Sequence, residues 1–375
     1  MNAAAPSPLE RQALARLKAG DAAGAEQDFA TALNAEHTPA ARARIWEGLG
    51  EARFAQGLAM EGAAALEHAG SDTQPRLSLR RALMLIQAGK FPLALETLSR
   101  LPASTRQGFD FWSLKADALR QTGRWSEATD AAGRGLKANP ASRNLALIRA
   151  AGLGHSGHWA DAEPVFRKYA DFPPAIEMHA GALVGSGQIA PARALLSSAL
   201  GRFPADASLH RALAMIAWMA GEKETFADGL IAAADARPAD MPLGLAAADL
   251  LRRAGRFEEA LARLEVLRRI HPSPHLASAC AIVLSALGRH DEAADLARLS
   301  AAKLPRIDWV RRNAASILLS AGAPDEALTQ AAWGLALDPA DQEWIAVDAV
   351  ARRASGDPSY RKNYDYDRFV KAFDL

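Results

Sequence analysis

The hexapeptide GRWSEA at residues 123–128 recurs as GRFEEA at 255–260 and as GRHDEA at 288–293. Alignment of the whole chain on the first glycine of this motif places equivalent glycines at residues 20, 57, 89, 123, 157, 187, 221, 255, 288, 322 and 356. The successive spacings are 37, 32, 34, 34, 30, 34, 34, 33, 34 and 34 residues. A period near 34 residues along most of the chain indicates stacked supersecondary units, because a single globular core has no such period.

Three further columns keep the phase of the glycines. Seven residues before each glycine the side chain is always small, as Ala13, Gly50, Ala82, Ala116, Ala150, Ala180, Ala214, Ala248, Ala281, Ala315 and Ala349. Five residues after it stand Ala25, Gly62, Ala94, Ala128, Ala162, Ala192, Phe226, Ala260, Ala293 and Ala327. Seventeen residues after it, proline occurs in seven successive repeats, at 140, 174, 204, 238, 272, 305 and 339.

Each column has a physical reason that predicts two antiparallel helices per repeat. Helices that cross at 8–10 Å need small residues at the contact, and glycine just past a helix end adopts the left-handed conformation that terminates it. Acidic or polar residues such as Ser126 and Glu127 suit the positive N-terminal end of the second helix. Proline stops that helix and begins the following repeat.

These columns resemble the signature of the tetratricopeptide repeat, which has small residues at its eighth and twentieth positions and a proline near its thirty-second. Trp46 and Trp112 fall where that family often places an early tryptophan. The resemblance covers about residues 7–355 and implies an all-α fold, a right-handed α-solenoid of stacked antiparallel helix pairs. We therefore expect a solenoid at 1–355, with ten repeats and one further first helix, followed by a separate segment at 356–375.

Three repeats depart from the pattern. Pro102 predicts that the second helix of the third repeat ends near Arg100, before a longer loop. The sixth repeat is four residues short and has Pro173 and Pro174 directly before its first helix. In GEKETFADG, at 221–229, Phe226 occupies the slot of a small residue, which requires the helix pair to spread or shift. These departures are interpreted either as bends or binding hollows, or as sequence drift.

Composition limits the classes of function. Forty-four basic and 43 acidic residues give a net charge of +1, which argues against a nucleic-acid binder, and hence against a pentatricopeptide-like RNA reader of similar period. The single cysteine, Cys280, allows no intrachain disulfide, and its small apolar neighbours predict a buried thiol. Neither a secretory signal nor an apolar run of about 20 residues is present, which predicts a cytoplasmic protein without membrane contact.

The resemblance implies that the chain binds a peptide or protein segment in a concave groove lined by the first helix of each repeat. The family's groove positions lie ten, six, three and two residues before each turn glycine, with one more at thirteen before. The candidate contacts chosen from these positions are Asp117, Arg120, Gln121, His155, Arg211, Met215, Trp218, Met219, Asp249, Arg252, Arg253, Trp309, Arg312 and Ser316.

Two groups among these candidates each have two interpretations. Trp218 between Met215 and Met219 suits an apolar ligand side chain, because thioethers and aromatic rings adapt to varied shapes. The same cluster also suits packing against the distorted seventh repeat. Arg252, Arg253 and Arg312 suit an acidic ligand, or else they form a solvated face beside Glu258 and Glu259.

The sequence predicts no catalytic, metal or cofactor site. The histidine pairs in HSGH (155–158) and HPSPH (271–275) lack a carboxylate or cysteine at metal-binding spacing, and no GxSxG motif occurs. The groove positions also lack the lysine and asparagine pair of the chaperone-binding clamp, and only Asn313 fits the asparagine ladder of the glycosyltransferase superhelix. The sequence predicts no oligomeric state.

The repeat pattern fails after Gly356, in the segment GDPSYRKNYDYDRFVKAFDL at 356–375. Tyr366, Phe369 and Phe373 are spaced to share one helix face, which suits a cap over the last repeat. The stretch YDYDRFVKAFDL is also similar to the junction at which bacterial tetratricopeptide-repeat proteins continue into a 2-oxoglutarate/iron(II)-dependent oxygenase domain. The alternative expectation is therefore a substrate-presenting scaffold whose catalytic domain and iron ligands lie beyond residue 375.

Overall fold

A computed structural model describes residues 5–35, 38–71, 74–222, 225 and 227–357, and this part of the chain contains 21 α-helices and no strand. The chain divides into two compact units, Met1–Ala192 and Arg193–Leu375, called the N-terminal and the C-terminal unit below. Phe226 and residues 358–375, with the aromatic side chains expected to form a cap, lie outside the described residues.

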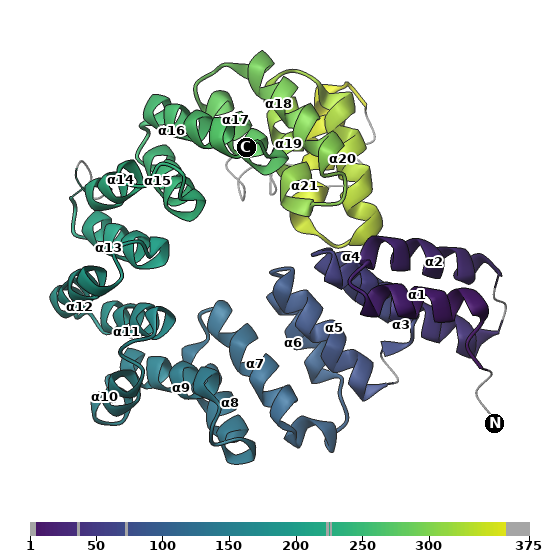
Figure 1. Ribbon diagram of the computed structural model, residues 1–375, viewed down its shortest axis with the longest axis horizontal. Helices are drawn as coiled ribbons and strands as arrows, with labels where there is room; N and C mark the ends of the chain where they lie inside the picture. Colours follow the sequence, from purple (N-terminus) through teal and green to yellow (C-terminus); the bar gives the residue numbers. More distant parts are fainter. Residues whose placement is uncertain (1–4, 36–37, 72–73, 223–224, 226, 358–375) are drawn as a thin grey trace. The chain divides into compact units, whose positions relative to one another are not determined.

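The N-terminal unit is a row of antiparallel helix pairs that follow one another in chain order (Figure 1). Its helices are α1 (Pro8–Lys18), α2 (Ala22–Ala35), α3 (Pro39–Ala55), α4 (Ala59–His68), α5 (Pro75–Gln87), α6 (Phe91–Ser99), α7 (Phe109–Gln121), α8 (Trp125–Ala138), α9 (Arg143–His155), α10 (Trp159–Lys168) and α11 (Pro173–Gly185). A short 3-10 helix, η2 (Thr105–Gln107), precedes α7, and α12 (Ile189–Arg202) contains the boundary between the units.

The C-terminal unit continues the same order of helices. It contains α13 (Ala207–Met219), α14 (Asp228–Asp235), α15 (Met241–Arg253), α16 (Phe257–Ile270), α17 (Pro274–Ala286), α18 (His290–Lys303), α19 (Asp308–Ser320), α20 (Pro324–Leu337) and α21 (Gln342–Ala354). The described helices therefore form ten pairs and one further first helix, as the glycine spacing predicts. The all-α repeat fold is confirmed.

The recurrence of GRWSEA is explained by the turn at Gly123. Gly123 has a φ of +71°, and its N–H donates to the carbonyl oxygen of Arg120 at 3.0 Å, while the Arg124 N–H donates to that of Leu119 at 2.9 Å. This pair of bonds is a Schellman cap, which needs a residue without a Cβ in the left-handed region. All eleven glycines of the column have φ between +71° and +88°, so the predicted turn occurs in every repeat.

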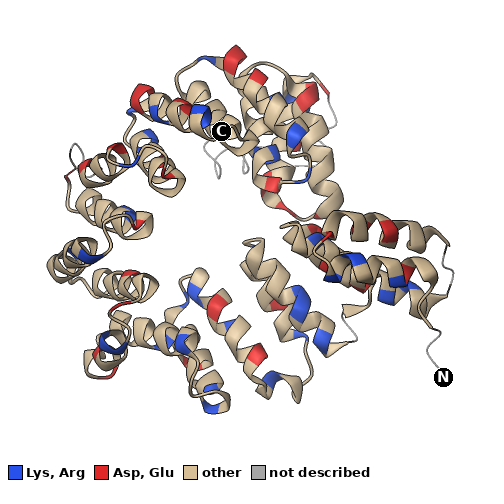
Figure 2. Cartoon of the chain, in the orientation of Figure 1, with Lys and Arg blue, Asp and Glu red and all other residues tan. Residues whose placement is uncertain are grey.

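The rest of the motif pairs an arginine with a glutamate at the start of the second helix. The Arg124 side chain donates two hydrogen bonds of 2.7 Å to the Glu127 carboxylate. The equivalent arginine and glutamate in GRFEEA and GRHDEA form the same paired contact. These ion pairs are exposed and add little stability. Figure 2 shows that acidic and basic residues are interspersed along both units.

The small-residue columns mark the places where the two helices of a pair cross. The alanines of both columns in the described residues are buried, with 0–3% of their surface exposed. In the second repeat both positions are glycine, and a Cβ added to Gly50 would lie 3.0 Å from the carbonyl oxygen of Gly62, as would the reverse. The apolar clusters join neighbouring helices only, for example α1–α3 around Phe29, so the core is a series of local clusters as expected for a solenoid.

The irregular repeats differ mainly in the length of the second helix. α6 ends at Ser99 and is followed by the loop that contains η2, as Pro102 predicts, and α11 begins at Pro173. α14 has eight residues where α16 and α18 have 14. Ala227 is fully buried in the apolar cluster of α13–α15, whereas Phe226, on which the expected spreading or shift depends, lies outside the described residues.

We predict that Ala116→Leu destabilises the N-terminal unit by about 1–3 kcal/mol, because three added carbons overpack the crossing of α7 and α8, where Ala116 is fully buried. Urea unfolding followed by circular dichroism measures the change. Ala160→Leu, at an exposed position of α10, is the matched control and should leave stability nearly unchanged. Equal effects of the two substitutions would show that the crossing is assigned to the wrong residues.

Candidate functional site on the first-helix face of the C-terminal unit

Two adjoining hollows lie on the side of the C-terminal unit formed by α13, α15, α17 and α19, called here the first-helix face. One, of about 370 Å³, lies between α13 and α15, and the other, of about 420 Å³, lies between α15, α17 and α19. Leu245 and Asp249 line both hollows. The two hollows are therefore parts of one depression across successive repeats.

Exposed apolar side chains gather on this face. Seven large hydrophobic residues of the described chain are exposed, and four of them stand at groove positions of α13, α15 and α19: Met215 (37%), Met219 (59%), Leu245 (36%) and Trp309 (45%). Trp218 lies between the two methionines but is half-buried and packs against the apolar cluster of α13–α15. Of this predicted trio, the methionines thus offer surface to a partner, while Trp218 also belongs to the fold.

The charged residues of α15 are paired with one another. The Asp249 carboxylate accepts hydrogen bonds from Arg252 at 2.8 Å and from Arg253 at 2.9 Å. Partial burial raises the pKa of Asp249, but the two arginines outweigh this effect and hold the pKa below its ordinary value. Arg211 of α13, which lines the first hollow, is exposed and has no ion pair or side-chain hydrogen bond among the described residues.

Arg312 lies at the centre of an ion-pair cluster that joins α19 to α21. Its guanidinium contacts the carboxylates of Asp308 at 2.6 Å, Asp341 at 2.8 Å and Glu343 at 2.6 Å. It also lies over the ring of Trp344, at 4.7 Å from the centroid. Burial lowers the pKa of Arg312, but its carboxylate partners outweigh this and raise it. The guanidinium of Arg312 is therefore bound by carboxylates of the chain itself. Ser316, one turn later on α19, is exposed.

The predicted residues of the N-terminal unit lie on α7 and α9. Arg120 donates to Asp117 at 2.8 Å on the same helix, and Gln121 is exposed at the end of α7. His155 is half-buried and stacks on Trp125, with ring centroids 4.2 Å apart. A Cβ on Gly185 of α11 would lie only 1.8 Å from His155 Nδ1, so the imidazole also packs against that helix. His155 is thus a contact between repeats.

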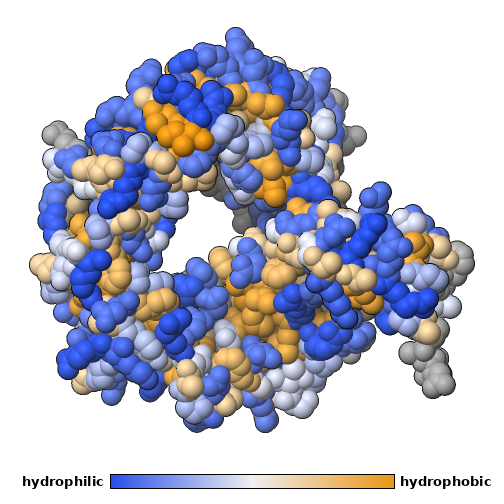
Figure 3. Space-filling view, in the orientation of Figure 1, coloured by the Kyte–Doolittle hydropathy of each residue, from blue (hydrophilic) through white to orange (hydrophobic). Residues whose placement is uncertain are grey.

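A larger hollow, of about 720 Å³, lies on α3, α5 and α7 of the N-terminal unit. Leu79, Leu83 and Leu114 line it, and Figure 3 shows apolar surface over α5, α6 and α7. Its basic residues are paired, since Arg76 contacts Glu47 at 2.6 Å and Arg80 contacts Glu51 at 2.5 Å.

Sequence reasoning missed several residues that line these hollows. They occupy the family's groove positions, at ten, six or thirteen residues before turn glycines: Glu51, Arg76, Leu79, Leu83, Asp110, Ser113, Ser208, Pro242, Leu245 and Ile282. The spacing rule that selected the other candidates includes them. Composition gives no signal for the leucines, because an aliphatic residue at helical spacing equally suits the core.

The comparisons with known proteins agree with this architecture. Residues 79–143 and 178–242 match the family model of the tetratricopeptide repeat. These two stretches thus have the sequence character of that repeat. No curated protein matches the chain.

Several solved structures are similar to the chain at low sequence identity. Yeast Tom70 is 14% identical over 98% of this chain and 90% of its own, with a TM-score of 0.44. The Cut9–Hcn1 hetero-tetramer of the APC/C contains a chain that is 14% identical, over 96% of this chain and 82% of its own, with a TM-score of 0.39. A tetratricopeptide repeat protein from Parabacteroides merdae is 12% identical over 71% of this chain and 97% of its own, with a TM-score of 0.40.

The remaining observations concern the single cysteine, grouped metal-ligand side chains, helix length and the C-terminal stretch. Cys280 is buried, as predicted, with 1% of its surface exposed, and burial raises the pKa of its thiol. Among the described residues, no three His, Cys, Asp or Glu side chains are grouped so that they could hold a metal ion. None of the described helices has the length and apolar character needed to cross a membrane. The stretch that resembles an oxygenase junction lies outside the described residues.

We predict that Arg312→Met destabilises the packing of α21 by up to about 3–5 kcal/mol, because Asp341, whose side chain is 4% exposed, would lose its ion pair with Arg312. Hydrogen exchange of the α21 amides measures the effect. Ser316→Ala, on the exposed side of the same helix, is the control. Exchange rates that are the same in both variants would mean that the ion-pair cluster does not hold α21.

The imidazole of His155 should titrate below its ordinary pKa of 6.5, because burial disfavours its charged form. The unfolded chain then binds this proton more readily than the folded chain, so folding stability falls as the pH is lowered from about 6.5 through the folded-state pKa. A histidine-selective NMR titration measures the midpoint, and Trp125→Leu should move it upward by admitting water. A midpoint at or above 6.5 in the unaltered chain would contradict the burial.

Proposed function

We propose that the chain is a non-catalytic protein-interaction scaffold that holds an extended segment of a partner protein on the first-helix face of the C-terminal unit. The observation that carries the proposal is the continuous depression of α13, α15, α17 and α19, in which Leu245 and Asp249 belong to both hollows. Exposed apolar groups beside a depression are typical of binding surfaces. The tetratricopeptide resemblance also implies peptide binding by first helices.

The surroundings of the depression favour a particular kind of segment. An apolar side chain of the partner would enter between Leu245 and Ile282, beside the buried Val283, and remove the exposed carbons of Leu245 and Ile282 from water. An acidic residue would pair with Arg211, because this guanidinium is exposed and has no partner within the described chain. Arg252 and Arg253 already bind Asp249 and thus contribute one net positive charge to the same face.

The C-terminal unit is the better candidate for the main contact because of its exposed apolar side chains. The hollow of the N-terminal unit is larger, but Arg76 and Arg80 at its rim are already neutralised by glutamates. Its free acidic group, Asp110, has no hydrogen bond or ion pair among the described residues. We assign this hollow a secondary role in the same scaffold.

A peptide array followed by fluorescence polarisation tests the main contact. Leu245→Asp should lower the affinity for bound peptides by at least about tenfold, because it places a charge in the centre of the depression where binding energy is concentrated. Arg211→Glu should lower the affinity for peptides with acidic residues and leave the affinity for neutral peptides unchanged. Leu245 is 36% exposed, so its replacement should not disturb folding.

Leu299→Asp is the matched control, since Leu299 is 47% exposed but lies on α18, a second helix. This variant should bind the same peptides as the unaltered chain. An array profile that is the same for Leu245→Asp and for the unaltered chain would refute the proposed site. Loss of binding with Leu299→Asp and not with Leu245→Asp would move the site to the second helices.

A further inference from the structure

Residues eleven before and eleven after the turn glycine contact each other across a helix pair in three repeats. Trp46 lies against His68 in the second repeat, with ring centroids 4.7 Å apart. The Arg134 guanidinium lies 5.0 Å from the ring centroid of Trp112 in the fourth repeat. In the tenth repeat the order is reversed, and Arg311 lies 4.6 Å from the ring of Trp333. Each of these pairs thus places one indole ring on a flat nitrogen-bearing side chain.

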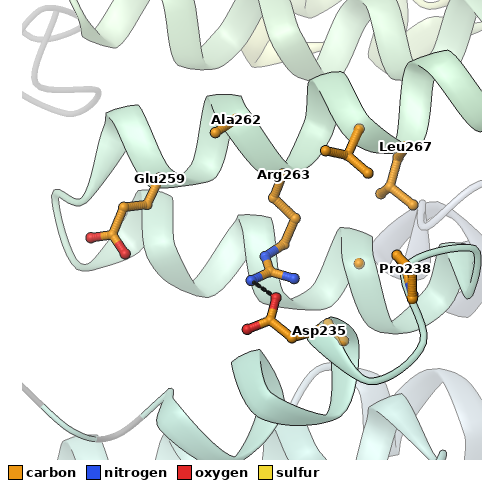
Figure 4. Close-up of a pocket in the computed structure, with 9 residues that line it drawn as sticks. Asp235, Pro238, Glu259, Ala262, Arg263 and Leu267 are labelled. Atoms are coloured by element: carbon orange, nitrogen blue, oxygen red, sulfur yellow. Dashed lines mark hydrogen bonds and ion pairs between the residues drawn. The ribbon is translucent and has the colours of Figure 1, made fainter.

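The eighth repeat has neither member of this pair. Gly244 and Val266 occupy the two positions, and a hollow of about 370 Å³ lies beside them between α14, α15 and α16. The methyl groups of Leu267 form its floor, since a Cβ on Gly244 would lie 2.7 Å from Leu267 Cδ1. Ala262, Val266 and Pro238 give it apolar walls, and Ala262 and Pro238 are labelled in Figure 4.

Arg263 supplies a guanidinium to this hollow. Figure 4 shows its side chain extending from α16 to Asp235, to which Nη2 donates at 2.6 Å. The side chain is 17% exposed, and its Nε–H is buried with no hydrogen-bond partner among the described residues. A buried donor without an acceptor costs free energy, so an acceptor brought by a ligand would be favoured there.

We propose that this hollow of the eighth repeat binds a tryptophan side chain of a partner polypeptide, with the indole beside Val266 and a carbonyl oxygen accepting from the Arg263 Nε–H. The ring then lies beside Val266, at the position that the chain's own Trp333 occupies in the tenth repeat, while Leu267 fills the space beside Gly244. The guanidinium of Arg263 adds a cation–π contact. Apart from Gly244 of α15 and Pro238 of the preceding loop, the site lies on α14 and α16 and shares no lining residue with the two hollows of the first-helix face, so it does not rest on the function proposed above.

The volume and chemistry of the hollow favour a side chain over a larger ligand. A volume of about 370 Å³ is near the lower end of the range for small-molecule sites and suits a single aromatic group. In the three filled repeats the ring reaches this position on a polypeptide, so the backbone next to a partner's tryptophan would lie at the open side. The Nε–H of Arg263 then donates to a carbonyl oxygen of the partner's backbone, a group that every polypeptide carries.

N-acetyl-L-tryptophanamide is a suitable probe, because it carries the indole ring and amide carbonyls. Methyl NMR of the full chain, labelled at alanine, leucine and valine, should show shifts at Ala262, Val266 and Leu267 with a Kd on the order of 1 mM. Val266→Trp fills the hollow from within, as Trp333 does in the tenth repeat, and should abolish these shifts. Arg263→Lys, which keeps the charge but removes Nε, should weaken binding roughly 3- to 10-fold.

Leu299→Trp is the matched control, since Leu299 stands at the same position of the ninth repeat and is exposed. It should bind the probe as the unaltered chain does, and circular dichroism should show both tryptophan variants folded. Leu245→Asp should leave probe binding intact, so failure of the peptide site and failure of this site are distinguishable. Absence of methyl shifts at these three residues at about 20 mM probe, or probe binding that survives in Val266→Trp, would overturn the proposal.

Peptides test the polypeptide source. Tryptophan-containing peptides on the array should bind the unaltered chain and Leu245→Asp but not Val266→Trp. If the amide probe binds and no tryptophan peptide does, the assignment to a partner polypeptide is wrong. Self-association measured by sedimentation that disappears in Val266→Trp would assign the site to a second copy of the chain and would also overturn it.

Discussion

The close crossing of two helices at small residues is the contact on which the rest of the structure depends. Where Gly50 faces Gly62, a Cβ on either residue would lie 3.0 Å from the carbonyl oxygen of the other, and the alanines at these positions in the other described repeats are buried. This crossing fixes which face of each helix is buried and which remains open. Because each pair buries its apolar face only against its neighbours, the core is a series of local clusters and not one central core.

The same packing determines where a partner can bind. Once the inner faces are buried, the first helices retain an outward stripe, and in the C-terminal unit this stripe carries Met215, Leu245 and Trp309. Most charges near it are neutralised within the chain, as Arg312 is by three carboxylates. The exposed Arg211 is therefore more informative about a partner than the larger number of arginines in the sequence.

Much of the fold can be predicted from the sequence because its determinants are local. A left-handed turn needs glycine, and a crossing needs a residue no larger than alanine, so both are visible as columns at a fixed spacing. The site is less predictable. Arg252, Arg312 and His155 satisfy the same groove spacing as Arg211, yet the first two are bound by carboxylates and His155 packs on Trp125. The pairs of Arg252 with Asp249 and of Arg312 with Asp308 follow helical i,i+3 and i,i+4 spacing, which the groove rule does not consider. The contacts of Arg312 with Asp341 and of His155 with Trp125 join different helices, and no spacing within one helix records them.

By itself the sequence determined the number of repeats, the turn glycines, the crossing residues and the early end of α6, because each depends on residues within one repeat. The tertiary structure alone decided which groove positions are open, that α14 has only eight residues, and that Gly244 and Val266 leave a hollow beside Arg263. These features depend on the volume that neighbouring helices leave unfilled. Such a volume is set by the packing of several side chains at once, and not by the identity of any one residue.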